Sequence, residues 1–368
     1  MIYLDNAATT RPCDESIAAV TQTMAQGFGN ASSLHRMGVT SGQTISVARR
    51  TVLKALGGGS PLDGDVYFTS GATESNNTAL LGAFDAYKRK GNKIVSTMIE
   101  HPSVGRVLDK LEKNGCTVVR LSPKDSEDFE AALAGAVDKE TVLVSCMAVN
   151  NETGYKVDVK RLYKLVKRAN PDTLVHIDAV QGFLKMPLEG DFISISGHKV
   201  HSPKGIGALY VKKGVRFTPL LVGGGQQKDL RSGTEPVELI AGLDAAIKAY
   251  KGNAEHFAGL KAHLLERLGT MEDIGINSDD RCVANIINFS VRGVRSEIML
   301  HSLEEQEIYV SSGSACSKGK VSGVLSALGV SDKDADCAIR VSLCAENTAE
   351  ELDKLCDYIQ KGIERFRR

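Results

Sequence analysis

The sequence has 368 residues and a formal net charge of zero, with 45 basic and 45 acidic side chains. Because these charges are interleaved rather than grouped in blocks, the composition argues against direct binding of nucleic acid or of a membrane surface. The chain is longer than a single hydrophobic core usually supports, so we expect one large domain and one smaller domain.

The first residues, MIYLDNAATTRP, lack a basic segment followed by an apolar run, so we expect no signal or transit peptide. No apolar run approaches the length of a membrane span. The eight cysteines show no C-x-x-C spacing, which favours reduced thiols in a cytoplasmic protein over a disulfide framework. Cys146 and Cys356 lie in apolar runs and are interpreted as small buried hydrophobic residues.

Between residues 64 and 213, short β-rich runs alternate with segments of helical periodicity. Strands are predicted over residues 65–70, 93–99, 116–122, 141–149, 173–180, 191–196 and 207–213. Helices are predicted between several of these strands, as over 74–90 and 159–170. This pattern predicts an α/β fold with a mainly parallel sheet of about seven strands covered by helices.

After about residue 250 the pattern changes to a long helix, a strand over 284–291, a loop, a strand over 338–343 and a last helix. We therefore expect a large domain over 14–250 and a small α+β domain made of 1–13 with 251–368. The last helix is predicted to begin with a capping box of Asn347 and Glu350. Its apolar stripe is predicted to be core and contains Leu352, Leu355, Cys356, Ile359 and Ile363.

Many polar side chains directly follow predicted strands. Ligands of open α/β sheets bind beyond the carboxyl ends of the strands, so these side chains are candidates for one site. The Ser-Gly-Ala-Thr turn over 70–73 opens a helix and suits a phosphate, although such a turn also simply caps a helix. Other candidates after strands are His101, Asn150, Asn151, Asp178, Gln181, Ser196, His198 and Lys199.

Lys199 follows a buried strand, where an amine is costly unless it is used or paired. Desolvation moves the pKa of such an amine toward the range of a nucleophile, so Lys199 could form a Schiff base. With Asp178 as counter-charge for a protonated ring nitrogen and a histidine to stack on the ring, the set matches pyridoxal phosphate. A catalytic zinc site is disfavoured, because His198 and His201 are the only near pair of ligands.

Three further segments carry candidate residues. Cys316 lies in SSGSACSKGK (311–320) among turn-forming residues, where a thiol is either reactive or incidental. Arg340 suits bidentate capture of a substrate carboxylate, or else an ion pair within the small domain. The Gly-rich segment 221–238 is either a flexible connection or a means of bringing Arg231 and Thr234 to a phosphate or carboxylate.

Taken together, these motifs resemble the cysteine desulfurases of the NifS/IscS type, in the class V aminotransferase group of fold-type I pyridoxal phosphate enzymes. The resemblance spans nearly the whole chain. It runs in order through YLDNAATT, FGNASSLH, FTSGATESNN, EHPSV, VNNETG, HIDAVQ, SGHKVHSPKGIGALY, GGGQQKDLRSGT, SSGSACS and IRVSL.

The resemblance implies a role for each matching residue. Lys199 would attach the cofactor, Asp178 would pair with its ring nitrogen, and His101 would stack on the ring and take part in catalysis. Asn151 and Gln181 would approach the ring hydroxyl. The remaining implied contacts are Ala72, Thr73, Ser196 and His198 with the phosphate, Thr234 with the phosphate from the other subunit of a homodimer, and Arg340 and Asn30 with the substrate.

The implied reaction removes sulfur from L-cysteine, giving L-alanine and a persulfide on Cys316 for iron–sulfur cluster assembly or tRNA thiolation. The acceptor would be a cluster scaffold or a sulfurtransferase, and Cys316 would be a transient iron or cluster ligand during transfer. The alternatives are selenocysteine lyase or another class V activity in which Cys316 is incidental, and a non-catalytic sulfur carrier. Two departures from the family pattern bear on the acceptor: Gln226, Gln227 and Lys228 replace a His-Glu-Arg type sequence, and the sequence ends at Arg368 without a longer tail.

Overall fold

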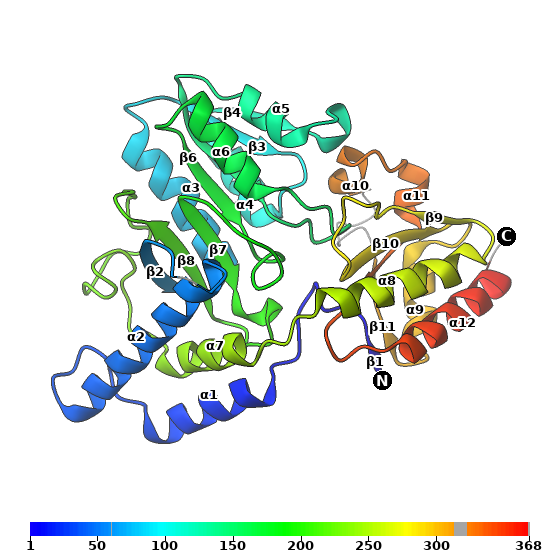
Figure 1. Ribbon diagram of the computed structural model, residues 1–368, viewed down its shortest axis with the longest axis horizontal. Helices are drawn as coiled ribbons and strands as arrows, with labels where there is room; N and C mark the ends of the chain where they lie inside the picture. The colour runs from blue at the N-terminus through cyan, green and yellow to red at the C-terminus, as the bar shows by residue number, and fades with distance from the viewer. Residues whose placement is uncertain (60, 313–321, 367–368) are drawn as a thin grey trace.

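Seven strands form the central sheet, in the spatial order β2-β8-β7-β6-β5-β3-β4 (Figure 1). Only β8 runs antiparallel to its two neighbours, so the expected mainly parallel sheet is confirmed. The computed structural model describes residues 1–59, 61–312 and 322–366. The strands of this sheet are β2 (Gly64–Thr69), β3 (Lys93–Thr97), β4 (Thr117–Leu121), β5 (Thr141–Met147), β6 (Leu174–Asp178), β7 (Phe192–Ser196) and β8 (Gly207–Lys212).

Helices cover both faces of this sheet, because its strands carry apolar side chains on both sides. In β2, Val66 and Phe68 pack into one core while Tyr67 packs into the other, as the alternation of a strand requires. One face is covered by α3 (Ala72–Tyr87) and α4 (Pro102–Lys113). The other face is covered by α2 (Arg36–Leu56), α5 (Phe129–Gly135), α6 (Val159–Ala169) and α7 (Val237–Ala249), with α1 (Asp14–Gln26) packed on α7.

The rest of the chain surrounds a four-stranded antiparallel sheet in the order β12-β13-β10-β9. Its strands are β9 (Ile274–Ile276), β10 (Ile286–Val291), β12 (Ser311–Ser312) and β13 (Ala338–Ser342). A short parallel pair joins the N-terminal β1 (Ile2–Tyr3) to β11 (Ile308–Tyr309). The helices of this part are α8 (Ala254–Gly269), α9 (Ser296–Glu304), α10 (Gly323–Ala327), α11 (Asp332–Asp336) and α12 (Ala349–Phe366).

The start of α12 corrects one sequence prediction. The capping box consists of Thr348 and Glu351, because the Glu351 carboxylate accepts from the Thr348 backbone N–H (3.3 Å) and the Thr348 hydroxyl accepts from the Glu351 N–H (3.4 Å). The expected pair of Asn347 and Glu350 was therefore wrong by one residue. Asn347 instead donates to the Tyr3 carbonyl and so attaches the helix start to the N-terminal strand.

The expected apolar stripe of α12 is confirmed, since its five members are all buried in the second core. Cys146 and Cys356 are also fully buried, as expected for small hydrophobic residues. The cysteines within the described residues are all free thiols. None of the described helices combines the length and the hydropathy that crossing a bilayer requires.

The N-terminal segment connects the two parts of the fold. After β1 pairs with β11, the chain passes to the central sheet, where the Thr10 backbone N–H donates to the His198 carbonyl (2.8 Å). Both termini lie on the side of the smaller sheet (Figure 1). The domain boundaries expected from the sequence stay a prediction.

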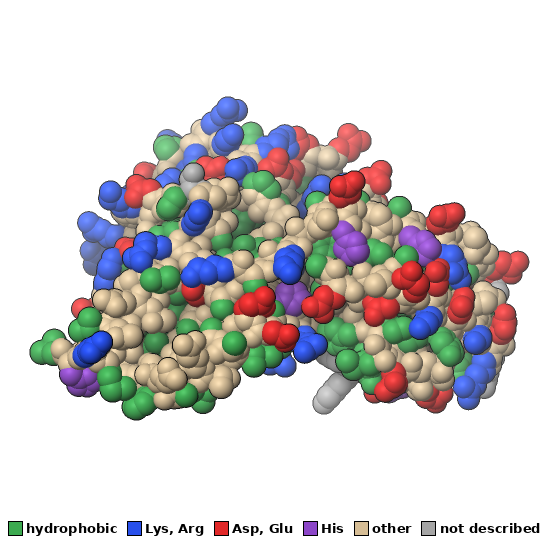
Figure 2. All heavy atoms as spheres, turned by 60° about the horizontal axis from the view of Figure 1, so that its bottom comes forward, with side chains coloured by type: hydrophobic (Ala, Val, Ile, Leu, Met, Phe, Trp, Pro, Cys, Tyr) green, Lys and Arg blue, Asp and Glu red, His purple; other side chains and the backbone are tan. Residues whose placement is uncertain are grey.

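The surface carries acidic and basic side chains side by side, together with hydrophobic side chains around α1 and α2 (Figure 2). Phe28 and Leu34, in the connection between these helices, are 68% and 98% exposed. Met24 and Val222 are also exposed. Exposed apolar groups gathered in one region commonly mark an interaction surface.

Candidate active site

A cavity of about 580 Å³ lies at the carboxyl ends of β5, β6 and β7, where the two parts of the fold meet. Parallel strands of a sheet end at the same edge, so polar residues that follow different strands converge there. Sequence-predicted residues that line the cavity are Ala72, Thr73, His101, Asn151, Asp178, Gln181, Ser196, His198, Lys199 and Arg340.

Lys199 follows β7 and places its amine between the N-terminal segment and the cavity. Its Nζ donates to the carbonyl oxygens of Ala7 and Ala8, each at 2.6 Å. Burial, followed by the positive charges of Arg340 and Lys185, lowers the pKa of Lys199 to about 8. A substantial fraction of this amine is therefore neutral and nucleophilic near physiological pH.

Asp178 is the last residue of β6 and is only 4% exposed. One carboxylate oxygen accepts from Asn76 Nδ2 (2.8 Å) and the other from the Val180 backbone N–H (3.1 Å). Burial raises its pKa, whereas these hydrogen bonds and the nearby His101 and Lys199 act in the opposite direction. A carboxylate held in this way is suited to bind a protonated ring nitrogen.

His101 caps the start of α4 and faces the cavity. Its Nδ1 accepts from the Ser103 backbone N–H (3.1 Å) and lies 2.8 Å from Ser103 Oγ, which in turn accepts from Asn76 Nδ2 (2.9 Å). Because a backbone N–H can only donate, Nδ1 is the acceptor and the proton of the neutral ring resides on Nε2. Burial lowers the pKa of His101, which keeps the ring neutral.

The N-terminus of α3 forms one end of the cavity. No side chain caps its first turn at Gly71, so backbone N–H groups at Ala72 and Thr73 are available to an anion. Ser196 and His198 line the cavity beside this turn. Burial and the charges of Lys199 and Lys204 lower the pKa of His198 to about 4, so its ring is neutral.

Arg340, on β13, is the cation that the smaller sheet brings to the cavity. Its guanidinium donates to Asp5 (2.5 Å) and to the Asn151 carbonyl (2.9 Å). Its buried Nε has no hydrogen-bond partner among the described residues. The ion-pair alternative and the carboxylate-binding alternative are therefore compatible, because one donor of a paired guanidinium remains unused.

Three predicted residues are not brought into this cavity within one chain. Thr234 and Asn30 are both exposed and do not line it. Arg231 forms an ion pair with the Glu74 carboxylate (2.8 Å), so its charge is used inside the chain. Cys316 lies outside the described residues, and the roles expected for it stay predictions.

Four contributors to the site were not predicted from the sequence. Asn76 lies one helical turn after Ala72 on the same face of α3, a spacing that could have indicated it. Ser103 and the carbonyls of Ala7 and Ala8 gain their roles only through contacts between distant elements. Within the described residues, no group of three or more His, Cys, Asp or Glu side chains is arranged to hold a metal ion.

The chain is similar to known proteins in sequence and in structure. The aminotransferase class-V family model matches residues 2–355. A cysteine desulfurase of Trichormus azollae is 37% identical over 385 residues, covering 100% of this chain and 94% of the relative. A solved NifS-like protein has a TM-score of 0.88 at 34% identity, covering 99% of both chains. A solved structure described as SspA in complex with cysteine has a TM-score of 0.80 at 29% identity, covering 95% of this chain and 100% of that one.

The chain therefore belongs to the aminotransferase class-V family and, within it, to the cysteine desulfurases of the NifS/IscS type. The resemblance inferred from the sequence motifs is confirmed.

Proposed function

We propose that this protein is a pyridoxal phosphate-dependent cysteine desulfurase, which converts L-cysteine to L-alanine and transfers the sulfur to Cys316. The observation that carries the proposal is the convergence of Lys199, Asp178 and the α3 N-terminus on one cavity with Arg340 at its side. The relative described in complex with cysteine supports the same substrate class. Neither selenocysteine lyase nor a non-catalytic sulfur carrier gains support from the relatives reported above.

The residues of the cavity fit pyridoxal phosphate. The uncapped turn at Ala72 and Thr73 suits the phosphate, the Lys199 amine suits covalent attachment, and the buried Asp178 suits the ring nitrogen. Asn76 Oδ1 and Arg340 Nε are buried without partners in the described part of the chain, as expected of a site that receives polar ligands. When bound, the cofactor serves as a sink for the electrons that remain on the substrate after proton removal.

The chain's own residues bind and orient the substrate and move its protons. Arg340 would hold the substrate carboxylate through its guanidinium, and His101 would lie against the cofactor ring with its Nε2–H directed into the cavity. The Lys199 amine, in its neutral form, would take the α-proton of the bound substrate. The carbonyls of Ala7 and Ala8 would hold the free amine close to the reaction centre.

The sulfur step assigns Cys316 as nucleophile. Its thiolate would attack the substrate sulfur, so that an S–S bond forms while the substrate C–S bond breaks. The electron pair of the broken bond stays with the carbon skeleton, which takes up one proton at Cβ, regains the α-proton from Lys199 at Cα and leaves as alanine. The persulfide would then pass to a scaffold or sulfurtransferase, with Cys316 as a transient iron or cluster ligand. The cytoplasmic location expected from the sequence is part of this proposal.

A homodimer would complete each site. Thr234 and Asn30 are exposed and lie outside their own chain's cavity, which supports their acting on the cavity of a second copy. The exposed apolar side chains around α1 and α2, including Phe28 and Leu34, offer a surface that a partner copy would cover.

Two substitutions test this function. Cys316→Ala should abolish alanine release from cysteine while the absorbance band of the bound cofactor persists, because only the sulfur acceptor is removed. Lys199→Ala should abolish both alanine release and covalent retention of the cofactor after borohydride reduction. Cys116→Ala is the matched control. It removes a buried thiol that does not line the cavity, so alanine release should remain intact. Desulfurase activity that survives Cys316→Ala would contradict the proposed sulfur transfer.

A further inference from the structure

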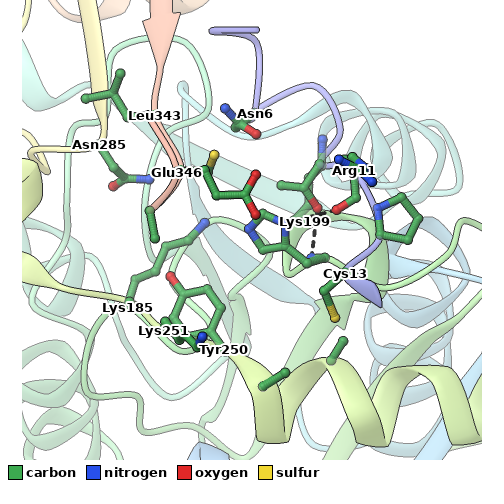
Figure 3. Close-up of a pocket in the computed structure, with 18 of the residues that line it drawn as sticks. Asn6, Arg11, Cys13, Lys185, Lys199, Tyr250, Lys251, Asn285, Leu343 and Glu346 are labelled. Carbon is green, nitrogen blue, oxygen red and sulfur yellow. Dashed lines mark hydrogen bonds between the residues drawn. The ribbon is translucent and has the colours of Figure 1, made fainter. Parts of the chain in front are cut away.

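A second cavity, of about 360 Å³, adjoins the candidate active site and is also lined by Lys199 (Figure 3). The two cavities share Ala7, Gln181 and Lys199 in their linings. The second cavity is bordered by the segment after β6, the end of α7 and the segment after β13. Lys185 belongs to this lining, and its side chain extends into the cavity (Figure 3).

The charge of Lys185 is not compensated. Its amine forms no hydrogen bond and no ion pair with any described residue, and burial lowers its pKa to about 8. The nearest comparison is Lys167, also partly buried, whose amine pairs with the Asp191 carboxylate at 2.7 Å. Lysines inside proteins are normally paired with a carboxylate, as Lys167 is. An unpaired lysine in the same cavity as a reactive lysine therefore requires an explanation.

The acidic residues of the same cavity do not neutralise Lys185. Asp14 lies 3.6 Å from the Arg11 guanidinium, and Asp14, Glu15 and Glu346 are all exposed to solvent at the rim. Solvent screens these carboxylates, whereas Lys185 is partly buried and lines the same cavity as Lys199. The inner end of the cavity therefore carries net positive charge.

We propose that Lys185 is a positioning residue that acts through Lys199, its uncompensated positive charge keeping the Lys199 amine in the neutral, reactive form. This inference rests on the proposed catalytic role of Lys199. Two neighbouring amines in a desolvated site disfavour each other's protonation, and one of them is thereby activated as a nucleophile and base.

The other charged groups around Lys199 do not account for the lowering of its pKa as Lys185 does. Arg340 and Lys185 lower the pKa of Lys199, while Asp5 and Asp178 raise it. Arg340 and Asp5 form an ion pair at 2.5 Å, so their effects on a third group largely oppose each other.

The remaining neighbours do not change this balance. His101 and His198 are neutral near pH 7.5, because burial lowers the pKa of each ring. The Asp178 carboxylate is engaged by Asn76 and by the Val180 N–H. Lys185 is thus the one cation acting on Lys199, among the described residues, that has no counter-ion.

The test measures the pH dependence of Lys199 labelling in the cofactor-free protein. An amine-reactive acetylating reagent modifies only neutral amines, and mass spectrometry of the Lys199 peptide gives the titration curve. In Lys185→Met the curve should shift upward by roughly one pH unit, the order expected for removal of one charge from a partly buried site. Labelling of Lys199 at pH 7.5 should then fall roughly tenfold, because the neutral fraction falls tenfold for each unit.

Two control variants separate charge from shape. Lys185→Arg keeps the positive charge and should leave the Lys199 curve close to that of the unsubstituted protein. Lys251→Met removes an exposed lysine from the rim of the same cavity and should also leave it unchanged. If Lys185→Met is folded, as judged by its thermal unfolding, and the Lys199 curve does not move, the inference is wrong.

A reciprocal measurement does not depend on the fold of the Lys185 variants. Charge–charge coupling acts equally on both partners, so Lys199→Met should shift the labelling curve of Lys185 upward by a similar amount. An unchanged Lys185 curve there would also overturn the inference. Because labelling requires neither cofactor nor cysteine, these outcomes are independent of the desulfurase assay, whose failure would affect only the proposed function.

Discussion

At the scale of single residues, Asn76 connects two reactive groups of the site. Its side-chain nitrogen donates both to Asp178 and to Ser103, and Ser103 in turn contacts His101. One buried amide thereby orients the carboxylate that would face the ring nitrogen and the hydroxyl that contacts His101 Nδ1. Asn76 is 0% exposed, so water cannot fully replace its hydrogen bonds if the side chain is removed.

Asn76→Ala should weaken binding of pyridoxal phosphate by roughly tenfold to a hundredfold, since a hydrogen bond to a charged group contributes on the order of 1.5–3 kcal/mol. The pKa of Asp178 should rise further, because the carboxylate loses a donor. Titration of the protein with cofactor, followed by absorbance at several pH values, measures both effects. Asn77→Ala is the matched control, because among the described residues the Asn77 side chain donates only to the Thr73 carbonyl of its own helix. Equal effects in the two variants would contradict the assigned role.

Glu100 is a second buried residue with an unusual protonation state. Its Oε1 accepts from Thr97 Oγ1 (2.6 Å) and from the Met147 N–H (2.9 Å), whereas Oε2 is buried without a partner among the described residues. Burial raises the pKa of Glu100 from 4.5 to about 8. The carboxyl group is therefore protonated in the folded protein over much of the physiological range.

This shift makes the folded state less stable as the pH rises. Below pH 4.5 the group is protonated in both states, and between pH 4.5 and 8 the unfolded chain ionises while the folded chain does not. The free energy of unfolding therefore falls by a few kcal/mol over this pH range, since each unit of pKa shift corresponds to about 1.4 kcal/mol. Glu100→Gln should remove this dependence, so urea unfolding should give a smaller fall in stability between pH 5.5 and pH 8 than in the unsubstituted protein. An unchanged pH dependence would show that Glu100 is ionised in the folded state.

At the scale of elements, the start of α3 is placed by its close approach to β8. A Cβ atom on Gly207 would lie 2.7 Å from the Gly71 Cα, closer than real Cβ contacts allow. A glycine is thus required where β8 begins, because only a residue without a side chain lets the turn over 70–73 pack directly against the start of this strand.

Gly207→Ala should displace this turn and weaken cofactor binding, with a loss of folding stability of roughly 1–3 kcal/mol from overpacking. Gly259→Ala in α8 is the control, because nothing lies within 4 Å of its Cβ position. That control should keep or slightly increase stability, as alanine is the better helix former. Thermal unfolding and cofactor titration of both variants distinguish local displacement from a general effect of added methyl groups.

The segment Gln226–Lys228, which departs from the family pattern, is used inside this chain. The Gln227 side chain accepts from the Phe68 N–H (2.7 Å) and donates to the Phe68 carbonyl (2.8 Å), so it pairs with the edge strand β2 as another strand would. Lys228 pairs with Asp65 of the same strand (2.9 Å). These contacts fasten the connection that carries Thr234 to the large sheet.

At the scale of the whole molecule, the candidate active site is lined by residues of both sheets, while Thr234 is exposed and does not line it. The proposed homodimer makes a specific prediction for mixed subunits. A Lys199→Ala chain paired with a Thr234→Ala chain contains one intact site if Thr234 acts across the interface. Random mixing of the two inactive or weakened variants should therefore restore about a quarter of full activity.

Desulfurase activity after unfolding and refolding the two variants together measures this restoration. Each variant refolded alone is the control and should remain at its own low activity. If Thr234 acted on its own chain's cavity, mixing would produce no intact site, and the activity would stay at the average of the two variants.

The sequence by itself determined the central sheet and most of the site. Alternation of β-rich and helical segments predicts all seven strands to within a few residues, because strands buried on both faces are continuous apolar runs. Residues such as Asp178 and Lys199 were identifiable because strand ends of a parallel sheet meet at one edge, wherever the intervening helices lie.

Only the tertiary structure decided which neighbours act on those residues. Asn76 reaches Asp178 across 102 positions, and the Ala7 carbonyl meets the Lys199 amine across 192, separations at which local sequence patterns carry no information. Lys185 has the same appearance in sequence as any surface lysine. Its position behind Lys199, without a counter-ion in the described residues, depends on how three distant segments close one cavity. Packing between such segments determines burial, and burial determines charge state, so the chemistry of the site required the folded chain.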